Sequence, residues 1–101
     1  MNSISVTYSD KHLRILIEEF IAMQRSEFTF KGICSYILYR AMEEGKTANN
    51  GIYESNQLEQ KDCDRVRDVL EMILAEGRLK VIISEIDSMT DNTKFEVINN
   101  G

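Results

Sequence analysis

Proline and tryptophan are absent from this sequence of 101 residues, which also contains only one histidine and two cysteines. Two cysteines are too few for a disulfide framework and are typical of a protein in a reducing compartment. One histidine and two cysteines are also too few for a typical structural zinc site, so we expect no metal and no other cofactor. No apolar run approaches the roughly 18–20 residues of a membrane span, and the polar N-terminus lacks the features of an export signal. We therefore expect a cytoplasmic protein with no membrane partner.

The composition is that of an ordinary globular domain. Hydrophobic residues make up 43% of the chain and charged residues 29%. A chain of this length folds as one unit with a modest core, so we expect a single domain over residues 1–101. The 17 acidic and 12 basic side chains give a formal net charge of −5.

Three stretches have the apolar spacing of amphipathic helices, in which hydrophobic residues recur every three or four positions. The first helix starts at a capping residue within residues 7–10 and ends near residues 23–25. The residues before it show no strong period. The second ends at Gly45, where glycine takes the left-handed cap position. The third carries a continuous apolar stripe over residues 63–74.

One loop separates the second and third helices. Residues 46–55 contain Asn49-Asn50-Gly51, a strong turn signal because asparagine and glycine tolerate positive φ. Ser55 or Asn56 is the expected N-terminal cap of the third helix, and Gly77 is its expected stop.

Three short segments alternate polar and apolar residues, as half-buried strands do. Residues 27–31 predict a brief strand between the first two helices. Residues 79–84 and 94–98 predict a C-terminal hairpin whose long tip, residues 85–93, is polar and acidic. The apolar stripes and strands together predict a core made of Leu13, Leu16, Ile17, Phe20, Ile37, Val66, Leu70, Ile73, Leu74, Val81 and Phe95.

Residues 64–79 (DRVRDVLEMILAEGRL) resemble the end of the recognition helix in the winged helix-turn-helix family. A leucine-rich stripe ends in Glu-Gly, and a hydrophobic residue then opens the first strand of the wing. Phe28-Thr29-Phe30 lies where that family has its short first strand. The resemblance covers roughly residues 9–98 and implies an α+β fold of three helices, a short strand and a C-terminal β-hairpin wing. The family joins its second and third helices by a tight turn, so here either the third helix starts early, near Asn56, or the turn is enlarged.

The resemblance implies a non-catalytic regulator of transcription that binds duplex DNA. In family members that bind DNA, the third helix enters the major groove and the wing contacts the backbone. Cations of the third helix would contact phosphate or guanine edges, its amides would pair with adenine, and cations of the wing would support them. These candidate contacts are Gln57, Gln60, Lys61, Arg65, Arg67, Lys80 and Lys94.

The charge distribution favours two other interpretations. Residues 51–80 hold five basic and seven acidic side chains, and residues 81–101 hold one basic and four acidic ones. Phosphate would repel an acidic wing, and the cations of the third helix can instead pair with neighbouring acids along a solvated face. The alternative function is an acidic protein–protein interaction module, or an inhibitor that docks on a basic, nucleic-acid-binding surface of a protein partner.

Catalysis has no support in the sequence, which contains no phosphate loop, metal motif or nucleophile elbow. We expect Cys34 and Cys63, on the apolar sides of the second and third helices, to be small buried hydrophobes. The two thiols would approach each other if these helices pack face to face. Met23, Tyr39 and Met42 are candidate interface residues for a homodimer or another partner, because tyrosine and methionine are enriched at interfaces.

Overall fold

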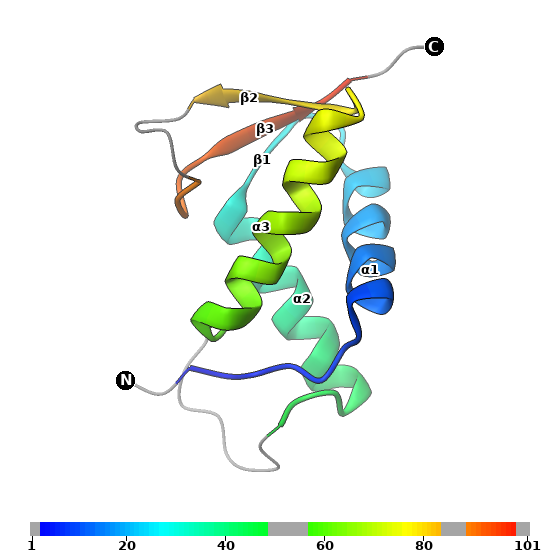
Figure 1. Cartoon of the computed structure of the whole chain (residues 1–101), viewed down its shortest axis with the longest axis vertical. Helices are drawn as coiled ribbons and strands as arrows, with labels where there is room; N and C mark the ends of the chain where they lie inside the picture. Colours follow the sequence, from blue (N-terminus) through cyan, green and yellow to red (C-terminus); the bar gives the residue numbers. More distant parts are fainter. Residues whose placement is uncertain (1–2, 49–56, 84–88, 99–101) are drawn as a thin grey trace.

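The computed structural model describes residues 3–48, 57–83 and 89–98 (Figure 1). The described residues form helices and a spatially separate antiparallel sheet, so the chain has the predicted α+β class and the predicted order of elements. These elements are α1 (Asp10–Met23), β1 (Glu27–Thr29), α2 (Phe30–Glu44), α3 (Gln60–Ala75), β2 (Leu79–Ile83) and β3 (Lys94–Val97).

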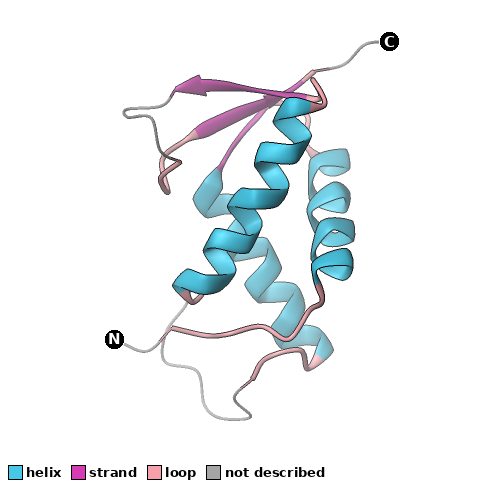
Figure 2. Ribbon diagram, viewed as in Figure 1, coloured by secondary structure: helices cyan, strands magenta, loops and turns pink. Residues whose placement is uncertain are grey.

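The sheet lies at one end of the helices (Figure 2). Its strands are antiparallel in the order β1-β3-β2, so the strand nearest the C-terminus is the central one. The register places Phe28 opposite Phe95, and their stacked rings have centroids 5.4 Å apart. The sheet thus closes one end of the core, and the predicted hairpin and its pairing with the short first strand are confirmed. Residues 85–88 of the predicted hairpin tip lie outside the described residues.

Capping residues set the ends of the first two helices. Ser9 precedes α1 and its side chain accepts a hydrogen bond from the backbone N–H of His12 at 3.1 Å. Gly45 ends α2 with a φ of 69°, a left-handed conformation that glycine adopts without strain. Both ends are as predicted. Thr29 Oγ1 accepts from the N–H of Gly32 at 3.0 Å and so starts α2 at Phe30. The predicted strand over residues 27–31 is therefore wrong in its last two residues, which are helical.

The connection between α2 and α3 is enlarged. The N-terminal cap of α3 is Glu59, whose side chain makes no capping hydrogen bond, and the helix begins at Gln60. The predicted cap at Ser55 or Asn56 is therefore wrong, since nothing in the sequence pattern before Cys63 marks this start. Ser55, Asn56 and the predicted turn at residues 49–51 all lie outside the described residues.

The core consists largely of the apolar stripes of the three helices. Most predicted core residues have relative exposures of 0 to 1%, and Phe20 and Leu74 pack against them as partly buried residues. The prediction of Val81 as a core residue is wrong, because its side chain remains 41% exposed. It lies on the edge strand β2 beside a break in register between Val81 and Ile83. Strand alternation predicts the side of a sheet that a residue faces, and not how far the helices extend over that side.

The segment before α1 is part of the core, contrary to the expectation that it has no regular pattern. We call residues 4–8 the N-terminal strap. Its alternate residues Ile4, Val6 and Tyr8 are only 3 to 5% exposed. The strap pairs in parallel with Leu58 and antiparallel with Thr47, so it joins the two ends of the α2–α3 connection. In Figure 1 it crosses the molecule at the end opposite the sheet.

Candidate functional site

The first turn of α3 is tied to the strap by a buried carboxylate. Asp62 is 1% exposed and accepts hydrogen bonds from the backbone N–H of Val6 at 3.1 Å and the hydroxyl of Ser5 at 3.3 Å. Arg65, one turn further along α3, donates to Asp62 at 3.0 Å. A buried charge of this kind needs such partners, because an unpaired one costs several kcal/mol. Asp62 therefore fixes the strap against the start of α3.

Arg65 extends the same junction. Its guanidinium donates to the carbonyl oxygen of Tyr8 at 2.5 Å and to Asp10 at 2.9 Å. This side chain was predicted to contact DNA, and the structure places it between α3, the strap and the start of α1. Its donors are directed at groups of the same chain.

Other predicted DNA contacts also bond to carboxylates. Arg67 donates to Asp64 at 2.9 Å, and Gln60 donates to the same oxygen at 2.9 Å. Lys80 lies 3.8 Å from Glu96 across the hairpin.

The remaining candidates occupy separate places. Lys61 is exposed on α3, and Lys94 is half-buried on β3. The backbone carbonyl of Gln57 accepts a hydrogen bond from the strap, at Ile4. The predicted contacts do not form one basic surface.

Arginines elsewhere in the described chain pair with acids in the same way. Arg78 and Arg14 bond to Glu18 and Glu76, in a cluster that joins α1, the end of α3 and the start of β2. Arg78 lowers the pKa of Glu18, and Arg14 lowers that of Glu76. This basic charge is thus neutralised within the fold.

The exposed side of α3 carries more acid than base, with Lys61 lying on it three residues before Asp64. We call Asp64, Asp68 and Glu71 the α3 acidic face, since their spacing of three and four residues places them on one side of the helix. Met72 lies beside them and is 50% exposed. This combination of carboxylates around one apolar side chain differs from the basic recognition surface that the resemblance implied.

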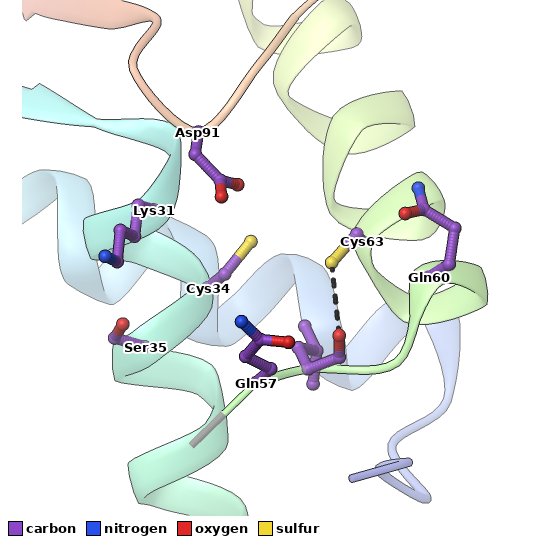
Figure 3. Close-up of a pocket in the computed structure, with 8 residues that line it drawn as sticks. Lys31, Cys34, Ser35, Gln57, Gln60, Cys63 and Asp91 are labelled. Carbon is purple, nitrogen blue, oxygen red and sulfur yellow. Dashed lines mark hydrogen bonds between the residues drawn. The ribbon is translucent and has the colours of Figure 1, made fainter. Parts of the chain in front are cut away.

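A cleft of about 220 Å³ lies on another side of α3 (Figure 3). It is bordered by α2, the start of α3 and the hairpin segment that contains Asp91. Cys34 on α2 is buried and Cys63 on α3 is half-buried, and their sulfurs face each other (Figure 3). The two thiols thus lie together where α2 and the start of α3 border the cleft. The expectation of a buried cysteine is met for Cys34 and is wrong for Cys63, which is half-buried at the cleft.

The candidate interface residues are exposed, at 55% for Met23, 59% for Tyr39 and 43% for Met42. Met23 is the last residue of α1, which ends near the sheet, whereas Met42 lies close to the opposite end of the molecule in α2 (Figure 1). Tyr39 and Met42 share one side of α2 by their spacing of three residues. Met23 is separated from them along the long axis.

None of the helices in the described ranges has the length and apolar composition of a membrane span. The same part of the chain contains no group of three or more histidine, cysteine, aspartate or glutamate residues that could hold a metal ion.

Comparison with protein-family models, with curated proteins and with solved structures finds no match to this chain.

Proposed function

We propose that this chain is a non-catalytic regulatory module of the winged-helix type that acts by binding a protein partner. The element order and the β1-β3-β2 sheet support the winged-helix assignment, with the β2–β3 hairpin following α3 directly as a wing would. The enlarged α2–α3 connection and the strap that pairs with it distinguish this chain from the family pattern.

The acidic exposed side of α3 is the observation that carries this proposal. A DNA-reading helix presents its first turns and their cations to the major groove. Here the first turn of α3 is bonded to the strap through Asp62, and Arg65 and Arg67 bond to carboxylates of the same chain. The charged side chains that remain exposed on α3 are Lys61, Asp68 and Glu71. The two carboxylates repel phosphate, and they outnumber the lysine.

The partner in this proposal has a basic surface with an apolar site at its centre. Carboxylates arranged around Met72 suit such a surface, because complementary charge speeds association while an apolar side chain supplies affinity once it is buried. The net charge of −5 favours the same encounter at long range. The partner's basic surface can itself be one that binds nucleic acid, in which case this chain competes with that nucleic acid.

A pair of matched variants tests the proposal. The double variant Asp68→Asn, Glu71→Gln removes two charges from the α3 acidic face and preserves the size of both side chains. The control Glu27→Gln, Glu43→Gln removes two charges from exposed positions on β1 and α2, so both proteins have a net charge of −5 + 2 = −3. The probe is a fluorescein-labelled peptide rich in arginine and leucine, titrated by fluorescence anisotropy.

We expect the α3 variant to bind this peptide roughly tenfold more weakly than the wild type, which corresponds to about 1.4 kcal/mol. The control should change the Kd by less than about twofold, because its charges lie away from the docking surface. Equal weakening by both variants, or no binding of the peptide by the wild-type protein, would contradict the proposal.

A further inference from the structure

The cleft beside α2 and α3 contains both cysteines of the chain. Cys34 comes from the buried side of α2, and Cys63 comes from the first turns of α3. Cys63 Sγ donates to the carbonyl oxygen of Leu58 at 3.6 Å, which orients the sulfur at the wall of the cleft (Figure 3). The cleft therefore holds a dithiol formed from two helices that are far apart in sequence.

We propose that Cys34 and Cys63 are a reversible redox pair, closed to a disulfide by exchange with a low-molecular-weight disulfide such as oxidised glutathione. The Cys63 thiolate attacks one sulfur of the oxidant, forms a mixed disulfide and releases one thiol. Cys34 then attacks Cys63 Sγ and releases the second thiol. The oxidant's S–S bond breaks and the Cys34–Cys63 bond forms. The two protons of the protein thiols end on the two released thiols.

The geometry assigns different roles to the two sulfurs. Both thiols line the cleft, but Cys63 is half-buried and Cys34 is buried, so an incoming disulfide reaches the more exposed Cys63 first. The hydrogen bond between the two thiols lowers the pKa of Cys63 and, together with burial, raises that of Cys34. An attacking cysteine that is accessible and more acidic, with a second thiol facing it, is the arrangement of a redox-sensitive pair.

The charged groups around the cleft have opposing effects on the reaction of the thiols with an oxidant. Lys31 lines the cleft and attracts the carboxylates of a glutathione-like oxidant, whereas Asp91 lines it from the hairpin side. Asp91 raises the pKa of both thiols, and Asp64 and Asp62 also raise that of Cys63. Arg67 lowers the pKa of Cys34. Closure of the disulfide links α2 to α3 across residues 34–63 and fills the space between the sulfurs, so it fixes the start of α3. This effect is independent of the partner proposed for the α3 acidic face.

The experiment equilibrates the full chain in glutathione buffers of increasing oxidised fraction, then blocks free thiols with an alkylating reagent. Mass spectrometry of the intact protein and a non-reducing peptide map follow. The wild type should lose two hydrogens, accept no alkylating group and give a peptide that links Cys34 to Cys63. Dithiothreitol should reverse the change. The melting temperature of the oxidised form should exceed that of the reduced form by about 5–15 °C.

Two serine variants separate the roles. Cys34→Ser should accumulate one glutathionyl group on Cys63, because the second thiol is missing. Cys63→Ser should stay reduced under the same conditions, because Cys34 is buried. The proposal is overturned if the wild type keeps both thiols alkylatable at every buffer composition, carries glutathione on both cysteines, or links two chains. The wild-type peptide map decides the matter even if a serine variant does not fold.

Discussion

The Asp62→Ala variant should have a free energy of unfolding about 3–5 kcal/mol below that of the wild type. The substitution removes the acceptor for the Val6 N–H and the Ser5 hydroxyl, and it leaves the partly buried guanidinium of Arg65 without its buried partner. Removing one member of a buried hydrogen-bond network lowers the stability by more than the whole network contributes to it. The reason is that the remaining donors stay buried without an acceptor. Urea unfolding followed by circular dichroism measures the change.

Asp64→Ala is the matched control for this prediction. Asp64 lies two residues further along the same helix and pairs with Arg67, but it is 50% exposed. Surface ion pairs contribute little, so we expect a loss below about 1 kcal/mol. Hydrogen exchange at the Val6 amide should accelerate in the Asp62 variant alone. Equal stabilities for the two variants would show that the strap is not held through Asp62.

The Phe95→Ala variant should lose about 3–5 kcal/mol of stability, a large part of the 5–15 kcal/mol that a small domain has in total. Phe95 is 0% exposed on the central strand and stacks on Phe28. Removing its ring opens a cavity where the sheet meets the helices, and neighbouring side chains fill such a cavity only in part.

Val81→Ala tests whether burial causes that loss. Val81 lies directly opposite Phe95 in the register but is 41% exposed, so its truncation should cost less than about 1 kcal/mol. If Phe95→Ala does not fold, Phe95→Leu should still be less stable than Val81→Ala, because shape changes in a filled core cost about 1–3 kcal/mol. If the Val81 variant is as unstable as the Phe95 variant, burial does not explain the loss and Val81 belongs to the core.

Local pattern was enough to predict the helices and the hairpin. A helix repeats its apolar positions several times, so the stripe of α3 from Val66 to Ile73 is unambiguous. The strap offered a shorter signal, the alternation of Ile4, Val6 and Tyr8, and its partners lie near residues 47 and 58 of the chain. Contacts at that separation depend on the tertiary fold, so an alternation of three residues does not reveal which segments the strap pairs with.

In the candidate site, too, only contacts between residues close in sequence could be predicted. Pairing of Arg65 with Asp62 and of Arg67 with Asp64 follows from a spacing of three residues on one helix, and the pairing of these cations with nearby acids was the alternative to DNA contact. The bonds from Arg65 to Tyr8 and Asp10 span more than fifty residues and could not be predicted. These bonds explain why Arg65 stabilises the fold and is not directed outward.

A titration of labelled random-sequence duplex DNA with the wild-type protein, at about 50 mM and about 200 mM salt, tests the central claim most directly. The claim is that Arg65 and Arg67 of α3 bond within the fold, and that the outward side of the helix carries mainly carboxylates, with one exposed lysine, Lys61, among them. It predicts no saturable rise in anisotropy at either salt concentration. Binding at the lower salt that collapses at the higher salt, and that weakens in Lys61→Ala or Arg67→Ala without loss of stability, would contradict it.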